Sequence, residues 1–277
     1  MIAPLTRISR LLGCGRIFMR RLIVTGLACP PDPWLALFGE KDVRVITLHE
    51  VMEHTASADP RQMSRYVTEQ IESYRPESLI AHDLGVPMTL LSLLRLNRRG
   101  LALDTKVTLF NGAFHKFDVF KANHAFRIQL MTTRRCIREI EAQDGQVDLR
   151  LKKHLPRIRA MYRLIILFGV AEKVSHTFGL EDFITLRGKF SVKSPLQIIA
   201  SRNDPYIPLE ALEQLRRDFR PRRFLAFDYG HYPYSTSQPN RLRRLLEEFE
   251  TEPNKEAPKG RRAPARRAPE RLHEAAP

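Results

Sequence analysis

The stretch that decides the fold is SLIAHDLG, residues Ser78–Gly85. Its first half is an apolar run typical of a short buried strand, and the residues after Gly85 have the apolar spacing of a buried helix. The chain must therefore turn abruptly at Asp83. A side chain at such a turn is lifted out of the top of the sheet, next to backbone N–H groups. The sequence thus predicts an exposed, ionised carboxylate, which suits attack on a carbon atom.

Short strands and helices alternate on both sides of this turn. Strands are predicted at Leu22–Leu27, Val43–Leu48, Leu79–Ala81, Val107–Phe110, Leu196–Ala200 and Arg223–Phe227, and helices at Pro60–Tyr74, Val86–Arg98, Leu209–Phe219 and Asn240–Phe249. This alternation is typical of βαβ units, which form a mostly parallel sheet flanked by helices. The fold class is therefore predicted to be α/β.

Composition and pattern divide the chain into a core, an insertion and two terminal segments. We predict that residues 21–114 and 194–251 form the α/β core, because the alternation is confined to them. Residues 115–193 are rich in Arg, Ile and Leu at helical spacing, which indicates an inserted helical cap. Residues 1–20 read as a basic extension. Residues 252–277 are rich in Pro, Ala, Arg and Glu, so they are predicted to be a disordered basic tail.

The formal net charge of +15 raises the question of an acidic partner. The segment His115–Phe190 holds fifteen Lys/Arg against eight Asp/Glu, so much of the excess lies in the insertion. No zinc-finger or RNA-binding motif accompanies it, which makes nucleic acid an unfavoured partner. An ordinary basic surface and a surface for an anionic or carrier-bound substrate both remain open.

Targeting and cofactor signals are absent from the sequence pattern. The three cysteines have irregular spacing, with no C-x-x-C pair, and no metal or cofactor motif is recognised. Arginines interrupt the first twenty residues, which argues against a secretory signal. No apolar run is long enough to span a bilayer. We expect a cytoplasmic protein, and the sequence does not indicate its oligomeric state.

Two further strand ends carry residues that suit catalysis beside Asp83. Asp204 follows the strand at Leu196–Ala200, and His231 follows the strand at Arg223–Phe227. Parallel sheets gather functional groups at the carboxyl ends of their strands. The chain order nucleophile, acid, histidine matches that of a hydrolase triad. Other roles stay open: helix capping for Asp83, turn formation for Asp204 and a purely structural loop position for His231.

These three motifs resemble the α/β-hydrolase superfamily. The run Ala81–Gly85 is similar to the H-D-W-G elbow of the epoxide hydrolase and haloalkane dehalogenase branch, which uses an aspartate nucleophile. The resemblance covers roughly residues 21–113 and 194–250, and residues 115–193 correspond only as a helical insertion at the cap position. It implies a covalent ester on Asp83 that is hydrolysed by water activated by His231.

The residues imply the supporting roles as well. Asp204 would orient His231, and the backbone N–H groups of Leu27 and Leu84 are the expected oxyanion donors. Candidate substrate-binding residues are Trp34, Asn111 and Tyr162. For Asn111, which ends a strand, a turn-forming role is the alternative.

Several positions depart from the family pattern. Thr25–Ala28 stands where the family has H-G-x-P, and Leu84 replaces the tryptophan with which dehalogenases hold halide. Epoxide hydrolases generally use two cap tyrosines, whereas Tyr162 is the only tyrosine between His115 and Lys193. The resemblance still predicts a hydrolase acting on an epoxide, an alkyl halide or a related small electrophile, although these departures fit neither type case. An inactive binding protein and an esterase or lactonase are the alternatives.

Overall fold

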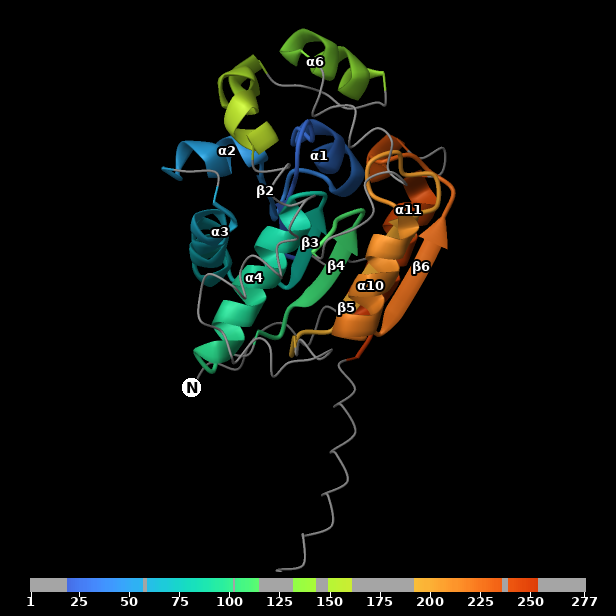
Figure 1. Cartoon of the computed structure of the whole chain (residues 1–277). Helices are drawn as coiled ribbons and strands as arrows, with labels where there is room; N and C mark the ends of the chain where they lie inside the picture. The colour runs from blue at the N-terminus through green and yellow to red at the C-terminus, as the bar shows by residue number, and fades with distance from the viewer. Residues whose placement is uncertain are drawn as a thin grey trace, which may run out of the picture.

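The computed structural model describes residues 19–56, 59–101, 103–114, 132–142, 149–160, 192–235 and 239–253. Its elements are β1 (Arg21–Val24), α1 (Asp32–Phe38), β2 (Val43–Ile46), α2 (Leu48–Glu53), α3 (Pro60–Tyr74), β3 (Ser78–His82), α4 (Gly85–Arg98), β4 (Lys106–Phe110), α6 (Thr133–Glu141), η2 (Leu149–His154), β5 (Leu196–Ser201), α10 (Leu209–Phe219), β6 (Arg223–Phe227), η3 (Pro233–Ser235) and α11 (Pro239–Thr251). Figure 1 shows them in chain order.

The strands form one parallel sheet in the order β2-β1-β3-β4-β5-β6. The order reverses between β1 and β3, because the chain first adds β2 on one side of β1 and then continues on the other. Ligand sites of open α/β sheets lie outside the carboxyl ends of the strands at such a reversal. Strands β3, β4 and β5 are fully buried, as expected for a sheet covered on both faces.

Helices pack on the sheet through apolar side chains. Helices α3 and α4 contact each other, α4 also contacts β1 and β3, and α11 contacts α1 and β4. The core includes the fully buried Trp34, Phe110, Phe114 and Phe249. From the inserted segment, Cys136, Ile140, Leu155 and Ile158 also enter this core. Side chains of the described parts of the insertion therefore belong to the same core, and Figure 1 shows α6 above α1.

The predicted α/β class and the parallel sheet are confirmed, and the helix at Pro60–Tyr74 has the predicted bounds. Two strands are shorter than predicted. The strand beginning at Arg21 ends at Val24, because the next residues leave the sheet and turn toward Asp83. The strand beginning at Val43 ends at Ile46, because the Thr47 hydroxyl accepts from the Glu50 N–H and starts α2.

Helices α1 and α2 are too short to show a helical apolar period, and the pattern analysis missed them. The boundaries of the core, insertion and tail remain predictions. The N-terminal extension before residue 19, most of the insertion and the tail after residue 253 lie outside the described residues. In the described ranges no helix is long and apolar enough to cross a membrane.

A buried ion pair joins the two ends of the core. Arg21 on β1 donates to Glu250 on α11 with two bonds, Nε to Oε1 at 3.0 Å and Nη2 to Oε2 at 2.7 Å. The Glu250 side chain is 1% exposed and that of Arg21 is 11% exposed. Bidentate geometry compensates part of the cost of removing both charges from water. The pair fixes the last helix against the first strand.

Replacing Arg21 with Met should therefore destabilise the fold strongly, because it leaves the Glu250 carboxylate buried without its partner. Breaking one side of a buried pair costs about 3–5 kcal/mol of unfolding free energy. The matched control is Arg99→Met, which breaks the exposed Arg99–Glu72 pair and should cost less than about 1 kcal/mol. Urea unfolding of both variants measures the difference. Equal effects in the two variants would contradict the role given to the Arg21–Glu250 pair.

Candidate active site

Asp83 lies in a strained turn between β3 and α4. Its φ of 52° is in the left-handed region. This conformation is unfavourable for any residue except glycine, so the surrounding packing must enforce it. Three glycines make the turn possible. A Cβ on Gly26 would overlap the Asp83 carboxyl group, one on Gly85 would overlap the Val24 carbonyl, and one on Gly112 would overlap Val86. The neighbouring loops thus close around Asp83.

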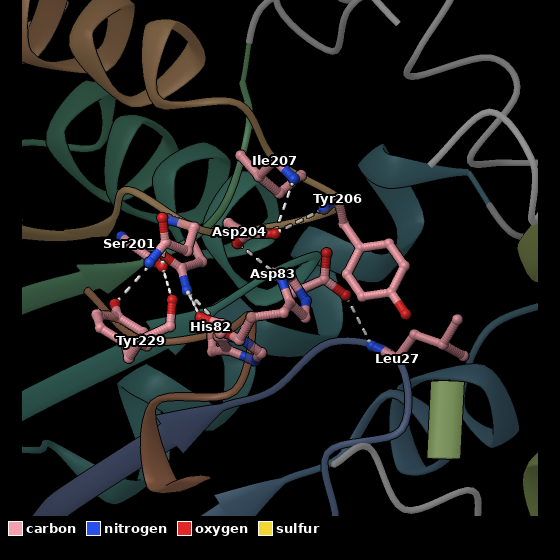
Figure 2. A network of polar contacts seen from close by, with 12 residues as sticks. Leu27, His82, Asp83, Ser201, Asp204, Tyr206, Ile207 and Tyr229 are labelled. Atoms are coloured by element: carbon pink, nitrogen blue, oxygen red, sulfur yellow. Dashed lines mark hydrogen bonds and ion pairs between the residues drawn. The ribbon is translucent and has the colours of Figure 1, made fainter. Parts of the chain in front are cut away.

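Asp83 is only 4% exposed, so the predicted exposure of its carboxylate is wrong. Its side chain points at the loop after β1, and the Leu27 N–H donates to Asp83 Oδ2 over 2.9 Å (Figure 2), so the structure brings these two residues together. Helix α4 has no side-chain cap, and its N-cap residue is Leu84. The contact with Leu27 gives Asp83 a partner outside the helix, so the carboxylate is more than a cap. The Leu84 N–H remains a predicted second donor.

His231 and Asp204 form a buried pair at the ends of β6 and β5. His231 Nδ1 lies 2.8 Å from Asp204 Oδ2, and both side chains are at most 3% exposed. The other oxygen of Asp204 accepts from the N–H groups of Tyr206 and Ile207 at 2.7 and 2.9 Å. Asp204 therefore shapes a turn and also holds the imidazole. Since Nδ1 is occupied, Nε2 is the nitrogen left for proton transfer.

Opposing effects set the pKa of His231. Burial alone would lower it, but the charge and hydrogen bond of Asp204 and the charge of Asp83 together raise the pKa above its ordinary value. Asp83 has the smallest of these effects, so its charge acts on His231 more weakly than Asp204 does. Converting Asp83 to a neutral ester would remove that contribution. The pKa of His231 would then fall. A larger fraction of the imidazole would be neutral, and able to act as a base, once an ester has formed.

The loop that carries His231 is held by two buried donors. Asn111 Nδ2 donates to the His231 carbonyl over 2.7 Å, and His82 Nε2 lies 3.0 Å from the same oxygen. Asn111 Oδ1 accepts from the Ser201 N–H and the Tyr229 hydroxyl. The Asn111 amide is therefore committed to joining the ends of β4, β5 and β6. The structure gives it this positioning role where the sequence suggested substrate contact.

His82 belongs to the same support. Its pKa is well below the ordinary value because of burial and the nearby charge of His231, so the ring is neutral. Nε2 must donate to the His231 carbonyl, which leaves Nδ1 as an acceptor. The Cys29 Sγ lies 3.2 Å from Nδ1, and burial raises the pKa of this thiol to about 12. Cys29 therefore stays protonated and donates to His82, which fixes the tautomer of the ring.

Tyr206 is a site residue that the pattern analysis missed. Its ring packs edge-on against His231 at 4.9 Å, and Figure 2 shows it beside the Asp83 carboxyl group. Burial, and after it the charges of Glu139, Asp204, Cys136 and Asp83, raise the pKa of its hydroxyl. The phenol is thus protonated at neutral pH and can donate a proton. The resemblance predicts substrate-activating tyrosines in the cap at residues 115–193, whereas Tyr206 lies two residues after Asp204, the predicted triad acid.

The remaining substrate candidates have different outcomes. Trp34 has no exposed surface and packs against the rings of His82, Phe110 and Tyr234. The structure therefore places it in the core beneath the site, in place of the predicted substrate contact. Tyr162 lies outside the described residues.

Solved structures share the fold of this chain. The thioesterase RedJ of the prodiginine pathway in Streptomyces coelicolor matches with a TM-score of 0.54 at 14% identity, over 83% of this chain and 89% of its own. The chain has the α/β-hydrolase fold. The type II thioesterase BorB of the borrelidin cluster matches with a TM-score of 0.54 at 13% identity, over 83% of this chain and 92% of its own.

A meta-cleavage product hydrolase from Pseudomonas fluorescens matches with a TM-score of 0.50 at 17% identity, over 83% of this chain and 90% of its own. No protein-family model and no curated protein sequence matches the chain. At these identities the likeness concerns the fold, so the chemistry must be argued from the residues of the site.

The electrostatic link between Asp83 and His231 is directly testable. In Asp83→Asn the charge is lost while the amide oxygen can still accept from Leu27, so the pKa of His231 should fall below its wild-type value. NMR titration of histidine-labelled protein measures this, and His231→Gln identifies the resonance. Glu139→Gln is the control, because no effect of Glu139 on the pKa of His231 is expected. An unchanged His231 pKa in Asp83→Asn would contradict the link.

Proposed function

We propose that this protein is a hydrolase in which Asp83 attacks a saturated carbon and forms an ester, which water activated by His231 then cleaves. The observation that carries the proposal is the hydrogen bond from the Leu27 N–H to Asp83 Oδ2. This bond holds Asp83 Oδ2 against a backbone donor, and in the proposed mechanism Oδ1 is the attacking atom. The bound oxygen is the one on which negative charge develops when water attacks the ester.

The first step would open the electrophile. Asp83 Oδ1 forms a bond to carbon while the bond from that carbon to its leaving group breaks. An epoxide suits the site best, because its ring oxygen needs a proton and Tyr206 is a protonated hydroxyl beside Asp83. The product of this step is a hydroxyalkyl ester of Asp83. Leu84, which stands in place of a halide-binding tryptophan, makes an alkyl halide a less favoured substrate.

The second step would cleave this ester. His231 Nε2 takes a proton from water, and the hydroxide adds to Cγ of Asp83. The negative charge on Oδ2 is stabilised by the Leu27 N–H, and Asp204 stabilises the imidazolium. Collapse of the intermediate releases the alcohol with the proton from His231 and leaves Asp83 as the carboxylic acid. The acid proton then returns to the Tyr206 phenolate, which restores the Asp83 carboxylate for the next turnover. Losing one oxyanion donor typically raises a barrier by about 2.7–4 kcal/mol.

Leaving-group chemistry disfavours acyl substrates for an aspartate. A tetrahedral intermediate between a carboxylate and a thioester expels the better leaving group. A carboxyl group has a pKa of about 3.9 and a thiol about 8.5, so the carboxylate would leave and the thioester would be restored. An alcohol leaves still less readily. At a saturated carbon no such intermediate forms, and the ester of Asp83 can accumulate.

Thioester or ester hydrolysis is the second candidate, because several of the similar structures are thioesterases. In this reading His231 would activate water to attack the acyl group directly. Asp83 would then support the imidazolium by its charge and form no bond to the substrate. Exposed Arg134, Arg135 and Arg138 on α6 would suit an anionic carrier-bound acyl chain.

A trapped adduct separates the two candidates. In His231→Gln the first step remains but water is not activated, so incubation with an epoxide should add the mass of one substrate molecule to the protein. Intact mass spectrometry detects the adduct, and peptide mapping should place it on Asp83. Asp83→Asn is the matched control and should stay unmodified. The panel includes terminal and internal epoxides, alkyl halides and acyl thioesters.

Turnover of thioesters by the wild type without any adduct from epoxides or halides would favour direct acyl hydrolysis. An adduct on another residue, or one that also forms in Asp83→Asn, would contradict the nucleophile assignment.

A further inference from the structure

A second cluster of functional side chains lies where the insertion meets helix α2. His49 and Glu53 are one helical turn apart on α2, so their side chains share a face. His154 ends η2 in the inserted segment, far away in sequence. Its Nε2 atom lies 2.7 Å from Glu53 Oε1, and His49 Nδ1 lies 4.0 Å from the same oxygen.

The three groups converge as metal ligands do. One ligand atom from each residue can be chosen so that all lie within 4.8 Å of one another. Around a tetrahedral zinc ion, ligand atoms are separated by roughly 3.3–3.6 Å, given bonds of about 2.0–2.2 Å. Small rotations of the side chains would bring the observed distances to these values. The rings of His49 and His154 are 5.6 Å apart, and one nitrogen of each lies within 4.0 Å of Glu53 Oε1.

The donor set is chemically selective. Two imidazole nitrogens and one carboxylate oxygen are a common set for zinc and also suit other first-row divalent ions, whereas calcium and magnesium prefer oxygen ligands alone. Glu53 Oε1 already lies 2.6 Å from Lys153 Nζ and 2.7 Å from His154 Nε2, so this oxygen faces positively charged or donor groups. His154 is 8% exposed, which limits the freedom of the ring before an ion binds.

Lys153 now occupies the place of a cation. Its Nζ lies 2.6 Å from Glu53 Oε1, and its side chain is 61% exposed. A flexible, exposed ammonium can swing into solvent when a metal ion binds, so it competes with the ion without blocking the site. The Glu53 carboxylate thus already binds the Lys153 ammonium, which a metal ion can displace.

We propose that His49, Glu53 and His154 form a zinc-type metal site that fastens the inserted segment to helix α2. The ligands come from both sides of this contact, and Arg157 strengthens it by donating to the Thr55 carbonyl over 3.3 Å. Three protein ligands leave a fourth position for water. The site is separate from Asp83 and His231 in its residues, and the proposal does not depend on the function assigned to them.

Zinc binding to the full chain tests the proposal. Protein stripped with a chelator is titrated with Zn²⁺ by calorimetry and with Co²⁺ by visible absorption. One ion should bind per chain, and His49→Ala, Glu53→Gln and His154→Ala should each weaken binding at least about tenfold, since even outer-shell partners are worth about 10–100-fold. His54→Ala is the control: His54 is next to Glu53, but its ring stacks on Tyr66, so binding should not change.

Lys153→Ala should bind Zn²⁺ more tightly than the wild type, because it removes the competing ammonium. A misfolded variant could not produce this gain of affinity.

Hydrogen exchange tests whether Zn²⁺ fastens the inserted segment to α2. Zn²⁺ should slow exchange in residues 149–160 of the wild type, and His49→Ala should abolish this protection. Three results would overturn the proposal. They are no zinc binding by the wild type, binding that persists unchanged in all three ligand variants, and weaker binding by Lys153→Ala than by the wild type.

Discussion

The strained turn at Asp83 is the constraint on which the rest of the site depends. A φ of 52° at a residue other than glycine persists only where its surroundings leave no alternative. Strand β3 is paired on both sides, by β1 and β4, and α4 follows at once. Gly26, Gly85 and Gly112 let the neighbouring backbones approach until they touch the turn. The carboxylate is therefore fixed before any substrate binds, which is the preorganisation that catalysis requires.

The chemistry follows from how this fixed charge is surrounded. Leu27 binds one oxygen of Asp83. Burial lowers the pKa of His231, and Asp204, with a smaller effect from the charge of Asp83, raises it above its ordinary value. Asp204 holds the imidazole from its other nitrogen, while Asn111 and His82 hold the loop that carries it. Neutralising Asp83 by ester formation would change the protonation of His231 in the direction that the next step needs. In the proposed mechanism, the charge of Asp83 would thus link the two chemical steps.

Much of this arrangement could be predicted from the sequence, since strand ends in a parallel sheet converge and the order of Asp83, Asp204 and His231 sets their roles. The supporting groups could not. Asn111 and Trp34 were predicted to contact substrate, but hydrogen bonding and packing direct them to the loop and the core. Tyr206 and the contact between His154 and Glu53 join residues far apart in the chain, and no local pattern marks such pairs. Helix α2 has only six residues, which is too few for a repeating pattern of apolar residues to mark it as a helix.

Isotope labelling in a single turnover tests the central claim most directly. With enzyme in excess over an epoxide substrate in H₂¹⁸O, attack by Asp83 puts the existing oxygen of the carboxylate into the product. Water then adds to the carbonyl carbon of the ester. The account predicts a first-turnover product without ¹⁸O and an Asp83 peptide that has gained ¹⁸O. Full labelling of the first-turnover product, with an unlabelled Asp83 peptide, would show direct attack by water and contradict the account.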